Sequence, residues 1–280
     1  MWYFELLRIR QWYKNLVVFI ALVFSLNFFD GQKLFTTLIA FFSLLQLSSG
    51  NYIINDIIDK KRDRNHPAKR KRPLASNKIS AKAALAVTTV LLVSGLWLAT
   101  LINIEYLALS IVFLMIGVLY TLVMKNIFLA DTITIAINFV LRAILGAIAI
   151  NVVFSSWLIV CTYLLAMTLA FGKRKAELCN GYKHYRGVLK YYSPDLLNNL
   201  SLMSITSLFI SYAIYTISQP HSAYMPLTLP MATFLLFRYM SFFYSNDNII
   251  EHSENLLKDR QIVLGSALWV IAVMIILYFL

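Results

Sequence analysis

Long apolar stretches separated by short polar segments run through the whole sequence. Most are near the ~20 residues that an α-helix needs to cross a bilayer. The pattern predicts nine transmembrane helices, at Leu16–Phe29, Leu34–Ile54, Ala81–Leu101, Tyr106–Met124, Thr132–Ile150, Trp157–Phe171, Leu196–Ile217, Met225–Tyr244 and Ile262–Leu280. No second domain or low-complexity segment interrupts the pattern. We therefore expect one all-α transmembrane domain over residues 1–280.

Composition supports an integral membrane protein. Of the 280 residues, 60% are hydrophobic and only 14% are charged, and the mean hydropathy is +0.70. A soluble domain of this length would need more polar surface. The net charge of +12 would suit nucleic acid, but the basic residues lie in the linkers between apolar spans, so no nucleic-acid partner is expected. Cys161 lies in a span and Cys179 in a polar loop, which indicates neither a disulfide nor a metal motif.

The distribution of basic residues predicts the orientation. Linkers on one side are brief, and those on the other side are longer and charged. Lys33 alone among the lysines and arginines falls in a short linker, and Arg142 and Arg238 fall within spans. By the positive-inside rule, the long linkers and the N-terminus are cytoplasmic, as for a multi-pass protein of the cell (inner) membrane. The segment before the first span lacks the features of a signal peptide, so we expect the first span to be retained.

An acidic stretch lies at the cytoplasmic end of the second predicted span. On a helix that advances about 100° per residue, Asp56, Asp59 and Asp63 fall at about 100°, 40° and 80° from Asn55. Carboxylates this close repel one another, and hard oxygen ligands suit Mg²⁺. A basic run, Lys60–Arg72, follows and could hold a phosphorylated substrate. A charge run alone would indicate a solvated loop, but the spacing of the acids favours a metal site.

Helix boundaries near this stretch can also be predicted. The residue before a proline disfavours the α conformation, so Pro67 should end the helix that carries the acids. The second span then extends beyond the membrane surface. Gly50 could allow a kink on the way.

Two further charged segments follow later spans. In Gly172–Asp195, Lys173, Arg174 and Lys175 stand beside Glu177, and one acid among several bases indicates an anion site. His184 in this segment has no partner at ligand spacing and is interpreted as a surface residue. In Asn246–Arg260, we interpret Asp247, Glu251 and Glu254 as exposed loop charges. Asp259 and Arg260 lie at the start of the final span and remain candidate site residues.

Arg142 lies near the middle of the fifth span, where a charge costs about 2.5–3.5 kcal/mol on insertion scales. Asp131 and Asn138 fall on about the same helix face, so a polar stripe could line the interior of the bundle. Two interpretations of Arg142 stay open: substrate contact, or a structural bridge to another span.

The acidic pattern resembles that of a known family. Asn55–Asp56–x–x–Asp59–x–x–x–Asp63 is similar to the first aspartate-rich motif of the UbiA superfamily of intramembrane prenyltransferases, which are nine-helix bundles with a cytoplasm-facing Mg²⁺ and diphosphate site. The resemblance implies that Asn55, Asp59 and Asp63 hold the metal and that Asp56 supports them.

Several other segments resemble one branch, the polyprenyl-phosphate phosphoribosyltransferases of decaprenyl-phosphate type. The branch would transfer 5-phosphoribose from phosphoribosyl pyrophosphate to a polyprenyl phosphate. The similar segments are Arg8–x–Arg10–Gln11–Trp12–x–Lys14–Asn15, Asp63–Arg64–x–His66–Pro67–x–Lys69–x–x–Arg72–Pro73, Arg142, Gly172–Lys173–Arg174–x–Ala176–Glu177–Leu178, Arg238–Tyr239, Asp259–Arg260 and Leu268–Trp269.

The chain departs from prenyltransferases proper at their second acidic motif. Those enzymes carry Asp–x–x–x–Asp after the sixth span, where this chain has Lys173–Arg174–Lys175–Ala176–Glu177. Lys175 also replaces a tyrosine that is frequent in the phosphoribosyltransferase branch. One acidic motif with several basic segments is the better electrostatic match for a donor and an acceptor that together carry three phosphorylated ends.

The resemblance assigns roles to individual residues. Asp59, Asp63, Lys173 and Glu177 are expected to be catalytic, with Glu177 orienting the bases or the ribose hydroxyls. Arg10 and Lys14 are candidates for the acceptor phosphate. The full set expected to bind substrate is Arg10, Lys14, Asp56, Arg64, His66, Lys69, Arg72, Arg142, Lys173, Arg174 and Arg260.

Other functions remain as alternatives. A prenyltransferase joining a polyprenyl diphosphate to an aromatic acceptor would share the first acidic motif. A transporter or lipid-binding scaffold would show paired, broken spans in two halves, and the sequence has no such repeat. A CDP-alcohol phosphotransferase is excluded because its aspartate series is missing. A homo-oligomer and the isoprenoid length are left open.

Overall fold

The computed structural model describes residues 2–153, 155–218, 223–245, 250 and 253–280, and every regular element in them is helical. The predicted loop charges Asp247 and Glu251 lie outside these residues. The chain forms two compact units. Unit 1 is Met1–Thr134 with Asn138–Phe154, and unit 2 is Ile135–Ile137 with Ser155–Leu280.

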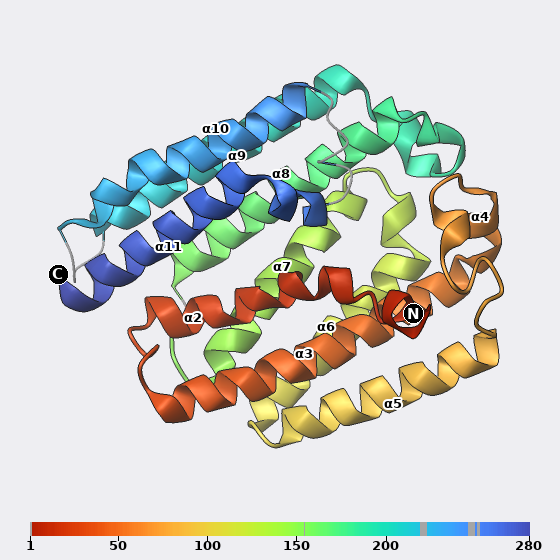
Figure 1. The fold of residues 1–280 in the computed structure, drawn as a ribbon, viewed down its shortest axis with the longest axis horizontal. Helices are drawn as coiled ribbons and strands as arrows, with labels where there is room; N and C mark the ends of the chain where they lie inside the picture. Colours follow the sequence, from red (N-terminus) through yellow and green to blue (C-terminus); the bar gives the residue numbers. More distant parts are fainter. Residues whose placement is uncertain (1, 154, 219–222, 246–249, 251–252) are drawn as a thin grey trace. The chain divides into compact units, whose positions relative to one another are not determined.

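Unit 1 is built around one long helix, α3 (Gly31–Ile58), with α5 (Ala81–Thr100) beside it (Figure 1). The carboxylate of Asp30 starts α3 by accepting hydrogen bonds from the Gln32 and Lys33 amides. The other elements in and around this unit are α1 (Trp2–Leu6), η1 (Ile9–Val18), α2 (Phe19–Phe24), α4 (Lys60–Asn65), η2 (Lys69–Lys71), α6 (Ile104–Leu122), η3 (Met124–Asn126) and α7 (Ala130–Ala149).

Unit 2 contains the later helices. In it α8 (Ser156–Cys179) lies along α9 (Pro194–Ser218), and α10 (Leu229–Tyr244) lies beside α11 (Arg260–Phe279) (Figure 1). Short 3₁₀ turns connect them, at η4 (Tyr182–His184), η5 (Gly187–Tyr191), η6 (Met225–Thr228) and η8 (Ser253–Lys258).

Seven helical segments in the described part of the chain are long and apolar enough to cross a membrane. They correspond to seven of the nine predicted spans. The eighth predicted span corresponds to α10, which is shorter. The first corresponds to η1 followed by α2, so this stretch is not one regular α-helix.

Contacts with α3 and α7 explain the unusual first segment. A ten-residue 3₁₀ run is rare, because this helix has poorer hydrogen-bond geometry. Trp12 Nε1 donates to Ser49 Oγ (3.2 Å), and Ser48 Oγ donates to Asn15 Oδ1 (3.0 Å). A Cβ added at Gly146 would lie 2.1 Å from the Val18 carbonyl oxygen, so α7 approaches the backbone of this segment directly. Tertiary contacts therefore set its conformation.

Helices α3 and α5 also approach closely. A Cβ at Gly50 would meet Leu92 Cδ2 at 2.7 Å, and one at Gly95 would meet Leu47 Cδ2 at 2.8 Å. Helix α3 continues through Gly50, so here the missing side chain allows close packing against α5. This packing supports the end of α3, from which the acidic motif projects.

Candidate active site

The acidic motif lies where α3 ends and α4 begins. Asp59 separates the two helices with φ −84° and ψ 0°. Helix α4 ends at Asn65 and His66 is extended, as predicted from Pro67. The motif therefore spans a break between two helices, so its acids do not all follow one straight helical face.

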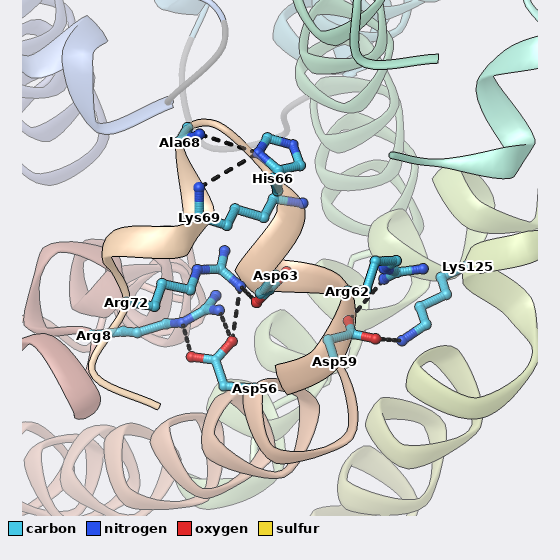
Figure 2. A network of polar contacts seen from close by, with 10 residues as sticks. All are labelled: Arg8, Asp56, Asp59, Arg62, Asp63, His66, Ala68, Lys69, Arg72 and Lys125. Atoms are coloured by element: carbon cyan, nitrogen blue, oxygen red, sulfur yellow. Dashed lines mark hydrogen bonds and ion pairs between the residues drawn. The ribbon is translucent and has the colours of Figure 1, made fainter. Parts of the chain in front are cut away.

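Asp56 and Asp63 face the same cation. Arg72 Nη1 donates to Asp56 Oδ1 at 2.9 Å and to Asp63 Oδ2 at 2.7 Å (Figure 2). Arg8 reaches Asp56 from the N-terminal segment with two donors, Nη2 to Oδ1 and Nε to Oδ2. Both acids are buried. One nitrogen thus occupies the point toward which two carboxylates converge.

Asp59 faces a different pair of cations. Lys125 Nζ donates to its Oδ1 at 2.7 Å, and Arg62 Nη2 donates to its Oδ2 at 2.9 Å (Figure 2). Lys125 comes from η3, after α6, and is buried together with Asp59. The structure therefore gives Asp59 its own counter-ions, separate from those of Asp56 and Asp63.

Burial and neighbouring charges shift the pKa values of these groups in opposite directions. Burial raises the pKa of Asp63, while Arg72 and Lys69 oppose the rise. Burial also acts to lower the pKa of Arg8, but its pairing with Asp56 outweighs this and the pKa is raised. Ionised Asp63 is therefore costly to bury, and it needs a cation close by.

The donor chemistry of the motif fits a divalent metal ion. Asp56 and Asp63 offer hard oxygens to a common partner, Arg72, and the half-buried Asn55 precedes them in the last turn of α3. Mg²⁺ is commonly held by one or two carboxylates, waters and substrate phosphates. Among the residues described, no three His, Cys, Asp or Glu side chains already form a metal-binding group. A metal ion bound here would therefore share or replace the contacts that these carboxylates make with Arg62, Arg72 and Lys125.

Other predicted binding residues in unit 1 support the loop after α4. Exposed Arg64 donates from Nε to the Ala75 carbonyl (3.2 Å) and from Nη2 to Asn77. Buried His66 accepts at Nδ1 from the amides of Ala68 (3.2 Å) and Lys69 (3.4 Å) (Figure 2). These contacts shape the turn that presents Arg72.

Near the N-terminus, Arg10 is exposed and Lys14 is half-buried beside the Tyr13 ring. Arg142 Nε donates to Asn15 Oδ1 at 3.0 Å, and its Nη1 donates to the Asn138 carbonyl at 2.8 Å. The structure thus contains the predicted bridge from the fifth span. Substrate contact by Arg142 stays a prediction.

Unit 2 contains a second group of charged side chains. Arg174 donates to Glu177, and Arg186 Nη1 lies 3.8 Å from Glu177 Oε2. Arg174 is fully buried, Glu177 is buried and Lys173 is half-buried. Glu177 thus lies between two arginines, and the anion site expected from the sequence stays a prediction.

The remaining predicted charges of unit 2 connect helices. Lys175 Nζ donates to the Phe243 carbonyl at 2.8 Å and lies 4.2 Å from the Phe243 ring centroid, so it caps the end of α10. Arg238 Nη2 donates to Asp259 Oδ2 at 2.8 Å. Asp259 also caps α11 through the Ile262 amide, and Arg260 is exposed.

Sequence reasoning missed the cations that hold the acids. Lys125 is the clearest example. It directly follows an apolar span and belongs to no recognisable motif, so its pairing with Asp59 was not predicted. Its position at the cytoplasmic end of the predicted fourth span was the available signal. Arg8 and Arg186 lie in basic segments that were recognised, but nothing in the spacing assigned them to Asp56 and Glu177. Only the folded arrangement shows these pairs.

The fold and the charged groups define a class: a helical membrane protein with buried acidic and basic groups suited to a metal ion and phosphate. The UbiA prenyltransferase family model matches residues 16–252. The chain belongs to this family and is a multi-pass membrane enzyme of it.

Individual relatives refine the comparison. Decaprenyl-phosphate phosphoribosyltransferase of Mycolicibacterium smegmatis is 28% identical over 220 residues, covering 76% of this chain and 69% of that protein. An uncharacterized protein of Sinorhizobium fredii, y4nM, is 31% identical over 171 residues, covering 61% of this chain. The match spans 33% of the length of that relative.

A solved structure shares the fold. The UbiA homolog from Archaeoglobus fulgidus bound to GPP and Mg²⁺ superimposes with a TM-score of 0.77 at 18% identity, covering 98% of this chain and 99% of that one. The all-helical UbiA fold expected from the acidic motif is therefore confirmed.

Proposed function

We propose that this enzyme transfers 5-phosphoribose from phosphoribosyl pyrophosphate to a polyprenyl phosphate, giving polyprenyl-phosphoryl-5-phosphoribose and pyrophosphate. The observation that carries the proposal is the excess of basic over acidic groups. Arg8, Arg62, Arg72 and Lys125 contact the acids of unit 1. In unit 2, Glu177 is flanked by Arg174 and Arg186. Three phosphorylated ends need more cations than one prenyl diphosphate does.

The reaction breaks the bond between C1 of the ribose and the pyrophosphate oxygen, and pyrophosphate leaves with the electron pair. An oxygen of the lipid phosphate forms the new bond to C1. A phosphate monoester has its second pKa near 6, so the acceptor is largely a dianion at neutral pH and needs no strong general base. Preorganised positive charge around the leaving group is then the main catalytic contribution.

Specific side chains take these roles. Lys69, Arg72, Lys173 and Arg174 bind phosphate oxygens, Glu177 orients the bases or the ribose hydroxyls, and Arg10 and Lys14 bind the acceptor phosphate. The remaining members of the predicted binding set are Arg64, His66, Arg142 and Arg260. When bound, Mg²⁺ would act as Lewis acid and template for the departing pyrophosphate. Asn55, Asp59 and Asp63 would hold it, with Asp56 in support.

The proposal includes the placement in the membrane. Nine spans with a cytoplasmic N-terminus put the acidic motif and the basic linkers on the cytosolic side of the inner membrane. Phosphoribosyl pyrophosphate and Mg²⁺ are cytosolic, so the donor would reach the site directly. The isoprenoid tail of the acceptor would lie along the spans.

A labelled sugar donor tests the reaction. Membranes that contain the protein are incubated with radiolabelled phosphoribosyl pyrophosphate and polyprenyl phosphate. We expect label in the lipid fraction, and we expect chelation of divalent ions to abolish it. Consumption of a prenyl diphosphate with an aromatic acid, without label in the lipid, would instead support the prenyltransferase alternative. The weak second acidic segment argues against that alternative.

A variant of the motif tests the role of the acids. Asp59→Asn should lower turnover by at least about 100-fold, because a metal ligand and a leaving-group contact are lost together. Asp195→Asn, an exposed acid in the first turn of α9, is the matched control and should retain activity. Full turnover by Asp59→Asn would contradict the metal role, whereas lipid transport or binding that Asp59→Asn leaves unchanged would favour a scaffold or transporter.

A further inference from the structure

The acids of the motif are already neutralised by the protein itself. Within unit 1, Asp56, Asp59 and Asp63 are contacted by Arg8, Arg62, Arg72 and Lys125 (Figure 2). This group has one more positive than negative charge. A divalent ion that approaches alone therefore enters a region whose acids are already paired.

The ion pairs at Asp59 and Asp63 are short, and the carboxylates are largely shielded from water. Lys125 and Asp59 have side chains only 8% and 11% exposed, and the Asp63 side chain is 3% exposed. Charge interactions are stronger at such sites than at the surface, because solvent screens them less. A metal ion alone would also leave Lys125, whose side chain is 8% exposed, without its carboxylate partner, and an unpaired buried charge is costly.

An anionic ligand changes this balance. A pyrophosphate group brings several negative charges, and its oxygens are good acceptors for guanidinium and ammonium donors. Arg72 could then move from Asp56 and Asp63 to phosphate oxygens, which would free Asp63 for the metal ion and leave Asp56 paired with Arg8. Lys125 could move in the same way from Asp59.

We propose that the divalent ion binds only together with a pyrophosphate-bearing ligand, and that Arg72 and Lys125 are positioning residues that exchange carboxylate for phosphate when the two enter. This inference rests on the proposed function, since it assumes that the motif binds a metal–pyrophosphate group. It adds an order of binding: the metal ion alone is rejected by counter-ions that the chain supplies.

The experiment uses the full-length protein in detergent and two probes. Binding of Mn²⁺ alone is followed by the electron paramagnetic resonance signal of the free ion. Retention of labelled inorganic pyrophosphate is measured with and without Mg²⁺. For the wild type we expect weak Mn²⁺ binding, and we expect Mg²⁺ to raise pyrophosphate affinity by at least about tenfold.

Arg72→Gln is the informative variant. It removes the cation between Asp56 and Asp63, so Mn²⁺ alone should bind at least about tenfold more tightly, while pyrophosphate with Mg²⁺ should bind more weakly. Lys82→Gln removes the same charge from an exposed position in the first turn of α5, outside the basic run, and is the control that should change neither value. Lys125→Gln tests the same exchange at Asp59 if Arg72→Gln does not fold.

Two outcomes would overturn the inference, and they differ in what they say about function. If the variants bind Mn²⁺ within about twofold of the wild type while Mg²⁺ still promotes pyrophosphate binding, the counter-ions do not control entry and the proposed function stands. If neither wild type nor variants bind Mn²⁺ or pyrophosphate under any condition, the metal–pyrophosphate site itself is wrong.

Discussion

At the scale of single residues, the site is governed by which cation neutralises which acid. Asp59 depends on Lys125 and Arg62, while Asp56 and Asp63 share Arg72. Buried charges are tolerated only when they are paired. The identity of each partner therefore matters more here than the number of charges in the segment.

Lys125→Met should destabilise the protein. It removes one of two cations at a buried carboxylate, and we expect a loss of about 1–3 kcal/mol in the free energy of unfolding. Thermal unfolding in detergent measures it, with the exposed Lys61→Met as control. In the double variant with Asp59→Asn, the two losses should not add, because the second change removes the charge that the first leaves less compensated. Additive losses would show that the pair is not coupled.

The pair of Asp259 and Arg238 predicts a dependence on pH. The hydrogen bond from Arg238 holds the pKa of Asp259 below its usual range. A carboxyl whose pKa is lowered on folding adds stability above the pKa of the unfolded chain, near 4, and this stability disappears as the pH falls through the folded value. Wild type and Asp259→Asn should thus differ at pH 7 and converge well below pH 4.

Thermal unfolding across that pH range measures the difference in stability between the wild type and Asp259→Asn. A difference that stays constant from neutral to strongly acidic pH would contradict the prediction. Asp259→Ala separates the two roles of the residue. Asn still caps a helix, whereas Ala removes the cap of α11 and should cost about 1 kcal/mol more at neutral pH.

At the scale of elements, close contacts between backbones position the segments that contribute residues to the site. The N-terminal segment η1 is held against α3 and α7, and it positions Arg8 for Asp56. Arg8 itself has a left-handed backbone, with φ 51° and ψ 47°, which costs free energy for a residue other than glycine. The conformation persists because the surrounding contacts determine it.

Gly146→Ala should loosen this arrangement. The new Cβ would meet a backbone carbonyl at 2.1 Å, which cannot move aside as a flexible side chain can. Overpacking of this kind costs about 1–3 kcal/mol, so we expect lower thermal stability and reduced turnover. Gly187→Ala, where an added Cβ meets nothing within 4 Å, is the control. Equal stability of the two variants would show that α7 and η1 are not in direct contact.

At the scale of the whole molecule, the distribution of charge predicts topology. The chain carries a net charge of +12, with its basic residues concentrated in the long linkers, and a bilayer orients such a protein with those linkers in the cytosol. An odd number of spans then places the termini on opposite sides.

Reporter fusions test this topology. Since we predict a cytosolic N-terminus and an exported C-terminus, a fluorescent protein at the N-terminus should fluoresce, and alkaline phosphatase fused after Leu280 should be active. Phosphatase fused after Asn77, in the long linker behind the acidic motif, is the control and should be inactive. Two termini on the same side would imply an even number of spans.

The sequence by itself determined much of this protein. Apolar stretches of bilayer length predicted a helical membrane protein, the spacing of Asn55, Asp56, Asp59 and Asp63 indicated the family, and Pro67 predicted the end of α4. Each of these signals is local, because it depends on chain periodicity or on the geometry of adjacent residues.

Only the tertiary structure decided the rest. The 3₁₀ form of Ile9–Val18, the break of the helix at Asp59 and the pairing of that acid with Lys125 all depend on segments far apart in the chain. An acidic stripe shows that cations are needed, but it does not show which of many lysines and arginines lie within reach. That choice depends on which helix ends meet, which no single stretch of sequence encodes.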